Sequence, residues 1–263
     1  MIRLGVTKEI ILLPLIYGLQ STGTRDRISL KYQSLAQNYS DLLEKRLDAA
    51  FISPDDYGKD SSRLKLSKDI AVASEGESRY AFLFFQQNIS DLELVAAKEI
   101  TQYSLLTNLL LCEVYDLEPQ WQYVEEKVST GELLKRYNAV LQAGEEALKN
   151  AREIETKIDV ADEWFDKTGL SFVHQVLAVQ PDFERYDLFD QLRRSGEEGL
   201  KNLSKIAEDL AEKYDYSPDY FSEMFSLHYK FFVGEAEWES CAEFLKYLFY
   251  YGNIPFIPQF HFV

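Results

Sequence analysis

The stretch LDAAFISPDDY (residues 47–57) decides the fold. Its first residues form a short and almost entirely apolar run, which is typical of a buried strand. Pro54 cannot donate to a sheet ladder, so the strand is expected to end before it, in a loop of small and acidic residues. Ligands of open α/β sheets bind beyond the carboxyl ends of parallel strands. Ser53 and Asp55 are therefore candidate ligand contacts; in the alternative interpretation they are turn residues and helix caps.

Strands and helices alternate on both sides of this stretch. Apolar runs predict strands, and apolar residues at helical spacing predict helices. The expected strands besides 47–52 are 2–6, 28–32, 80–85, 94–97, 120–124, 139–143 and, as the last one, 172–179. The small-residue segment 69–78 turns at Gly76, and Thr101 is expected to cap a helix over 101–114. This pattern predicts an α/β fold.

The order of the elements predicts two lobes. The first is expected to consist of residues 1–86 and 172–263, and the second of residues 87–171, with a ligand cleft between them. From residue 182 the pattern is helical almost to the end, with helices expected over 186–214, 218–225 and 235–251. The aromatic residues of the last helix are expected to pack onto the first lobe.

Composition limits the function classes. The chain has 263 residues and a net charge of −16, and an acidic surface repels nucleic acid and anionic membranes. A small anionic ligand stays possible, because a cleft can be locally positive. The sequence has neither a secretory signal nor a cysteine framework, so we expect a cytoplasmic protein. Since the aromatic C-terminal helices could also bury a dimer face, both a monomer and a homodimer stay open. It also has no dinucleotide, P-loop, zinc-binding or nucleophile-elbow motif, which predicts no metal and no cofactor.

Five segments carry a resemblance to a known family. They are LDAAFISPDDY (47–57), DIAVASEGES (69–78), NAVLQAGEEAL (138–148), VADEWFDKTGLSFVHQVLAV (160–179) and YGNIPFIPQFHF (251–262). In their order and spacing they resemble the chorismate dehydratases of the futalosine route to menaquinone. That resemblance implies a type II periplasmic-binding-protein-like clamshell with extra C-terminal helices. It also implies a hydro-lyase that converts chorismate to 3-[(1-carboxyvinyl)oxy]benzoate without a cofactor.

The resemblance is incomplete at positions that matter for catalysis. The family has an asparagine thought to touch the substrate, and the matching position here is Ile11. A family serine is replaced by Tyr80, a Thr-Ser pair by Thr101-Gln102, a Gly-Asp pair by Gly144-Glu145, and a proline by Ser171. No catalytic residue is therefore assigned. The substrate's own carboxylate is the candidate base, and the protein would act mainly by orienting the substrate.

A dianionic substrate needs donors, and the expected binding residues supply them at strand ends and helix starts. They are Thr7, Lys8, Ser53, Asp55, Ser74, Gly76, Arg79, Tyr80, Thr101, Gln102, Tyr103 and Gly144. For Lys8 and Arg79 the alternative is solvated surface charge, and for Tyr80 and Tyr103 it is packing. Glu145 would repel a carboxylate and is expected in the first turn of a helix.

Two functions of different class follow. One is a divergent chorismate dehydratase of menaquinone biosynthesis. The other is a non-catalytic binding protein or sensor for a small carboxylate, suggested by Ile11 and Tyr80.

Overall fold

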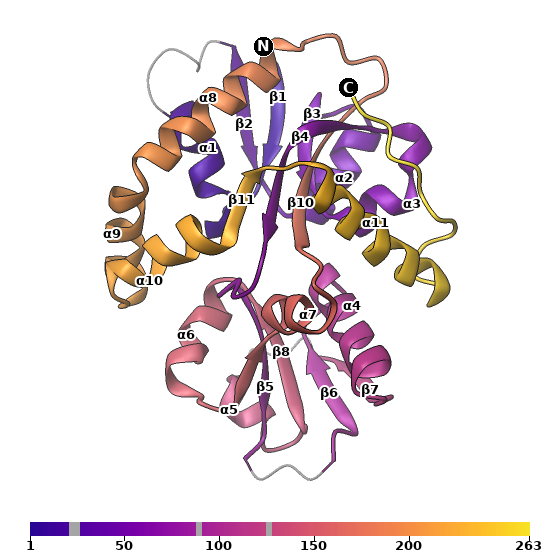
Figure 1. The fold of residues 1–263 in the computed structure, drawn as a ribbon, viewed down its shortest axis with the longest axis vertical. Helices are drawn as coiled ribbons and strands as arrows, with labels where there is room; N and C mark the ends of the chain where they lie inside the picture. Colours follow the sequence, from indigo (N-terminus) through magenta and orange to yellow (C-terminus); the bar gives the residue numbers. More distant parts are fainter. Residues whose placement is uncertain (21–26, 88–90, 125–127) are drawn as a thin grey trace. The chain divides into compact units, whose positions relative to one another are not determined.

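The computed structural model describes residues 1–20, 27–87, 91–124 and 128–263 (Figure 1). The chain forms two compact units, one of residues 1–74 and 172–263 and the other of residues 75–171. Each unit is built around its own sheet, one with six strands and one with five. The predicted mixed α/β fold is confirmed.

The sheet of the first unit has the order β11-β4-β10-β3-β1-β2. Its strands are β1 (Ile2–Val6), β2 (Ile28–Tyr32), β3 (Ala49–Ile52), β4 (Lys65–Ser74), β10 (Phe172–Val179) and β11 (Tyr229–Phe232). β1 pairs in parallel with β2 and β3, while β10 is antiparallel to both β3 and β4. β1, β3 and β4 therefore run in one direction, and the residues that follow them gather at one edge of the sheet.

Helices cover both faces of this sheet (Figure 1). They are α1 (Leu13–Gln20), α2 (Leu35–Leu43), α3 (Pro54–Lys59), α8 (Asp187–Lys201), α9 (Leu203–Tyr214), α10 (Pro218–Glu223) and α11 (Glu235–Tyr250). Short 3-10 helices lie at Ile10–Leu12 and Ser61–Arg63, and a π-helical turn at Met224–His228. α1, α8, α9 and α10 lie on one side of the sheet, and α2, α3 and α11 on the other.

Helices α1 and α8 approach each other unusually closely, and glycine permits it. A Cβ added at Gly199 of α8 would lie 2.7 Å from the carbonyl carbon of Pro14, and closer still to its oxygen. A Cβ added at Gly18 would lie 2.8 Å from the Cα of Ser195. Backbone atoms cannot yield as side-chain ends do, so this helix pair depends on its glycines.

The sheet of the second unit has the order β7-β6-β8-β5-β9. Its strands are β5 (Ala81–Phe85), β6 (Leu94–Ala97), β7 (Gln120–Tyr123), β8 (Ala139–Ala143) and β9 (Lys157–Asp159). Its helices are α4 (Gln102–Leu109), which continues as a π-helical segment at Leu110–Val114, α5 (Thr130–Leu133), α6 (Glu145–Glu153) and α7 (Val160–Thr168). β6, β7 and β8 are parallel, so their carboxyl ends meet at one edge.

The core of this unit follows from strand alternation. Phe82 and Phe84 of β5 lie in one buried cluster with Leu133 and Ala147 of helices α5 and α6. α7 and α4 pack together, and α7 also packs on β5. The strand ends are therefore held between two helical layers.

Three predictions about elements are wrong. The strand expected at 80–85 was placed in the first lobe, but β5 pairs with β8 and β9, and the first crossing lies between Ser74 and Glu75 instead of near residue 87. Residues 172–179 do not form the last strand, because β11 follows and pairs with β4. The single helix expected over 186–214 is divided at Asn202 into α8 and α9. An apolar run predicts that a strand is buried, but it does not predict which sheet the strand joins.

Among the described residues, none of the helices combines the length and the apolar composition that crossing a bilayer requires. The same part of the chain contains no group of three or more His, Cys, Asp or Glu side chains placed to hold a metal ion.

Candidate functional site

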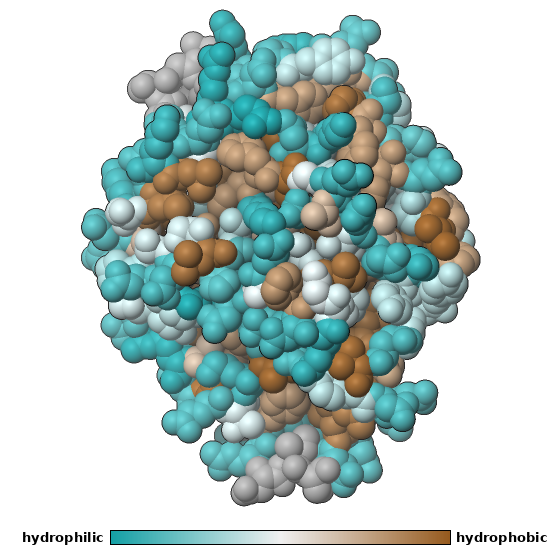
Figure 2. Space-filling view, in the orientation of Figure 1, coloured by the Kyte–Doolittle hydropathy of each residue, from teal (hydrophilic) through white to brown (hydrophobic). Residues whose placement is uncertain are grey.

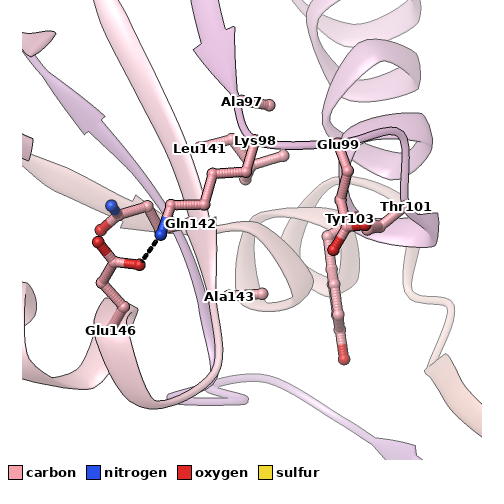
Figure 3. A pocket seen from close by; sticks show the side chains of 9 residues that line it. All are labelled: Ala97, Lys98, Glu99, Thr101, Tyr103, Leu141, Gln142, Ala143 and Glu146. Atoms are coloured by element: carbon pink, nitrogen blue, oxygen red, sulfur yellow. Dashed lines mark hydrogen bonds and ion pairs between the residues drawn. The ribbon is translucent and has the colours of Figure 1, made fainter. Parts of the chain in front are cut away.

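A pocket of about 110 Å³ opens at the carboxyl ends of β6 and β8 in the second unit (Figure 3). Its lining comes from these strand ends and from the starts of the helices that follow them: Ala97, Lys98, Glu99, Thr101, Tyr103, Leu141, Gln142, Ala143 and Glu146. The carboxyl edge of parallel strands is where α/β sheets bind ligands. The predicted residues Thr101 and Tyr103 lie here.

Gln142 contributes an unused donor to this pocket. Its side chain is buried, and its Nε2 has no hydrogen-bond partner. Asn150 Nδ2 donates to Gln142 Oε1 over 2.6 Å and to Thr130 Oγ1 over 2.7 Å. Because the oxygen of the Gln142 amide accepts this hydrogen bond, the NH₂ group is the end that lacks a partner. Leaving a buried donor unpaired costs about 1–3 kcal/mol, which a ligand acceptor would recover.

The charged groups of the pocket are one cation, Lys98, and two carboxylates, Glu99 and Glu146, and a helix starts beside them. Lys98 forms an ion pair with Glu146 of the first turn of α6. Thr101 is the N-cap of α4, and its N–H donates to Ser104 Oγ over 2.9 Å. The first turn of a helix favours a negative group. The volume of the pocket fits a small polar group, and the start of α4 is the part of its lining that favours a negative one.

Tyr80, Tyr103 and Gly144 lie together beside this pocket. The two tyrosine rings are buried, with centroids 5.6 Å apart. Gly144 has a φ of 77°, and a Cβ added to it would lie 3.3 Å from the Tyr80 hydroxyl. Gly144 N–H donates to the Tyr80 carbonyl over 2.8 Å. Gly144 has a positive φ and leaves space beside the Tyr80 hydroxyl. A residue with a side chain at position 144 would occupy that space.

The other predicted residues of this unit lie in the turn before β5 or at the starts of helices. Arg79 has a φ of 52° and pairs with Glu77 over 2.9 Å, and Gly76 has a φ of 73° in the turn before it. Gln102 is buried at the start of α4. Glu145 lies in the first turn of α6, as predicted.

In the first unit, Gln175 ties the loop after β1 to the sheet. This residue of β10 is fully buried, and its Nε2 donates to Thr7 Oγ1 over 3.3 Å and to the carboxylate of Glu9. Thr7 is buried and also accepts from Glu9 N–H over 3.4 Å. Lys8 of the same loop is exposed. Thr7 is therefore held in place at the carboxyl end of β1.

Ser74 forms a buried pair with His174. The Ser74 Oγ and His174 Nε2 are 2.9 Å apart, and the imidazole stacks on Tyr229 with ring centroids 5.4 Å apart. Burial lowers the pKa of His174 to about 3. A base with so low a pKa is weak at neutral pH. The imidazole is therefore suited to hold the Ser74 hydroxyl in position rather than to remove a substrate proton.

Ser53 and Asp55 have structural contacts. Ser53 is the N-cap of α3, and its Oγ accepts from Asp56 N–H over 3.4 Å, as its alternative interpretation expects. Asp55 is buried and pairs with Lys59 over 3.0 Å. Ile11 is fully buried in the 3-10 helix after β1.

Sequence reasoning missed Gln142, His174 and Gln175 as site candidates, and it missed Lys98. The signal for the first three was present, because each is a polar residue inside an otherwise apolar strand, in AVLQA (139–143) and FVHQVLAV (172–179). A buried polar side chain in a strand requires a partner and so marks a place worth attention. Lys98 follows β6 directly, but one exposed lysine has no distinguishing pattern.

Comparison with solved structures identifies the fold. A protein from Archaeoglobus fulgidus matches over 96% of this chain and 98% of its own, with 17% sequence identity and a TM-score of 0.70. The periplasmic aliphatic sulphonate binding protein of Escherichia coli matches over 98% and 89%, with 10% identity and a TM-score of 0.69. A Candida albicans protein described as having the generic periplasmic binding protein fold matches over 94% and 89%, with 11% identity and a TM-score of 0.66. The chain therefore has the periplasmic-binding-protein fold.

Comparison of sequences identifies the family. No curated protein matches the chain. The sequence model of the family described as "Menaquinone biosynthesis", however, matches residues 2–250, which is nearly the whole chain. The chain belongs to the menaquinone biosynthesis family.

Proposed function

We propose that this protein is a divergent chorismate dehydratase, which removes water from chorismate to give 3-[(1-carboxyvinyl)oxy]benzoate on the futalosine route. The observation that carries the proposal is family membership over residues 2–250. The pocket of the second unit supports it, because Lys98, Gln142 and the start of α4 suit one carboxylate of a dianionic substrate. The same proposal makes the protein cytoplasmic.

Dehydration of chorismate requires few catalytic groups from the protein. One ring C–H bond and the C–O bond of the hydroxyl break, the proton and the hydroxyl leave as water, and the ring becomes aromatic. A carboxylate of the substrate is the proposed base, so the chain would need to orient the ring and assist the leaving hydroxyl. Thr7 and Ser74 are proposed donors, because Gln175 and His174 hold their hydroxyls in place.

A second candidate is a non-catalytic binding protein for a small carboxylate. Two observations favour it. Ile11, which stands where the resemblance places a substrate-contacting asparagine, is fully buried and apolar. The E. coli protein of the same fold is a binding protein for aliphatic sulphonates, which are small anions.

An absorbance assay separates the two. Purified protein is mixed with chorismate, and the ultraviolet spectrum is followed with product identification by mass spectrometry. A dehydratase converts chorismate to the benzoate product in proportion to enzyme concentration. Saturable binding without product supports the binding protein, and overturns the dehydratase proposal.

A further inference from the structure

Gln142 lines the pocket, and the donor end of its amide is buried beside the pocket without a partner. Gln142 is 6% exposed, and its Nε2 is buried without a hydrogen-bond partner while the residue lines the pocket. The bond from Asn150 to its Oε1 keeps the amide from turning over, because the reverse orientation would bring two NH₂ groups together. The donor therefore has a defined direction and lacks only an acceptor.

The Lys98–Glu146 ion pair lies beside Gln142 in the pocket lining, and it can separate at a small cost in free energy. Lys98 and Glu146 meet on the same pocket wall, and Figure 3 shows both side chains ending close to that of Gln142 in this view. Their side chains are 52% and 43% exposed. Exposed ion pairs contribute little to stability, so a competing anion can exchange for one partner.

We propose that a carboxylate of the ligand takes the place of Glu146 on Lys98, and that it then accepts a hydrogen bond from Gln142 Nε2. Glu146 is in this account a competitor built into the chain. It keeps Lys98 neutralised in the empty pocket and so selects for anions. A hydroxyl or amide oxygen can accept a hydrogen bond from Lys98 but does not supply the negative charge of Glu146, so a neutral ligand end gains little by displacing it.

The pocket takes one end of a ligand and not a whole ring. Its volume is about 110 Å³, whereas a cavity that binds benzene measures about 150 Å³. A carboxylate with its attached carbon fits this space. The inference rests on the proposed function for the identity of the whole ligand, and it names the group that this subsite recognises.

The test uses the full chain labelled with ¹⁵N and titrated with benzoate, a carboxylate probe. The side-chain NH₂ signals of Gln142 are identified by their absence from the spectrum of Gln142→Met. They are expected to shift on addition of benzoate. Glu146→Gln removes the competitor and is expected to tighten benzoate binding about fivefold, the range expected for losing an exposed ion pair.

The matched control is Glu153→Gln. Glu153 is an exposed carboxylate of the same helix, α6, at the end away from the pocket, and its substitution changes net charge by the same amount. Benzoate affinity in this variant is expected to stay within about twofold of the unsubstituted protein, because surface charges at this distance are screened. Equal effects of the two substitutions would overturn the proposal.

Two substitutions at Gln142 test the donor itself. Gln142→Glu keeps an acceptor for Asn150 and removes the donor, and Gln142→Met removes the amide without adding charge. Both are expected to weaken benzoate binding about tenfold or more, provided that the backbone amide spectrum stays that of the folded protein. Where one variant fails to fold, the other decides. A folded variant that binds benzoate as tightly as the unsubstituted protein would overturn the proposal.

The outcomes also separate this inference from the proposed function. A benzoate response with the expected effect of Glu146→Gln, in a protein that neither binds nor converts chorismate, supports the subsite and overturns the proposed function. Conversion of chorismate with no response of Gln142 to benzoate overturns the subsite alone.

Discussion

Two buried polar residues in strands, Gln142 and His174, illustrate how partners decide a residue's role. His174 Nε2 lies 2.9 Å from Ser74 Oγ, whereas Gln142 Nε2 has no partner. A satisfied buried group stabilises a unique packing, and an unsatisfied one costs free energy unless a ligand completes it. We therefore assign His174 a positioning role and Gln142 a binding role.

The burial of His174 predicts a pH dependence of stability. Its pKa is lowered from 6.5 to about 3, so the unfolded chain binds a proton that the folded protein excludes. The stabilisation is complete above pH 6.5 and is lost as pH falls toward 3. Between pH 6.5 and pH 4.5, the unfolding free energy should fall by about 2 kcal/mol more in the natural sequence than in His174→Gln. Urea unfolding followed by tryptophan fluorescence measures this difference.

The control for this prediction is His261→Gln, which removes an exposed imidazole. Its unfolding free energy should follow the pH dependence of the natural sequence. If His174→Gln retains the full loss of stability at low pH, then His174 does not titrate with a strongly lowered pKa.

At the scale of elements, the crossing of α1 and α8 is the contact most sensitive to one added methyl group. A Cβ at Gly199 would lie 2.7 Å from the carbonyl carbon of Pro14. Alanine has the better helix propensity by about 1 kcal/mol, but forced backbone displacement costs more. Gly199→Ala should therefore lower the unfolding free energy by about 2 kcal/mol or more, as measured by urea unfolding.

Gly131→Ala is the matched control for this substitution. Gly131 lies in α5, is exposed, and has no atom within 4 Å of an added Cβ. Here the propensity term is unopposed, and stability should stay constant or rise slightly. A Gly199→Ala variant as stable as the Gly131→Ala variant would show that the two helices can separate without cost.

The elements differ in how well a sequence predicts them, and the reason is physical. Runs such as 47–52 and 139–143 are apolar over most of their length, and β3 and β8 form there. β11 has four residues and follows a π-helical turn, so its apolar signal merged with that of neighbouring helices. The pairing of β5 with β8 and β9 depends on tertiary contacts that no local pattern contains.

The candidate site was predicted in part for the same reason. Of the predicted binding residues, Thr101 and Tyr103 line the pocket of the second unit and Gly144 lies beside Tyr80, and strand ends and helix starts leave local signals for such positions. The polar Gln142 inside an apolar strand was a usable signal, but its meeting with Lys98 in one pocket depends on the parallel pairing of β6 and β8, which no local pattern contains. The bonds from Gln175 to Thr7 and from Ser74 to His174 join residues more than ninety positions apart.

For the whole molecule, net charge is the dominant feature. Hydrophilic residues cover most of the face shown in Figure 2, with separate apolar areas between them, and the net charge is −16. Such a surface repels a dianion at long range, even where the pocket attracts its carboxylate at short range.

This repulsion predicts a salt effect on association. The screening length falls to about 8 Å at 0.15 M salt, so the association rate constant of chorismate should rise about twofold or more between 0.01 M and 0.15 M salt. Stopped-flow fluorescence measures the rate, with a neutral ester of the ligand as the control whose rate should stay constant. A rate that falls with salt would mean that a positive local field dominates.

The central claim of the proposed dehydratase is that this chain binds chorismate. Calorimetric titration of the purified protein with chorismate tests it most directly. The account predicts saturable binding, tightened in Glu146→Gln and weakened in Gln142→Glu. A folded protein that releases no binding heat at several temperatures, and that leaves chorismate unchanged, would contradict it.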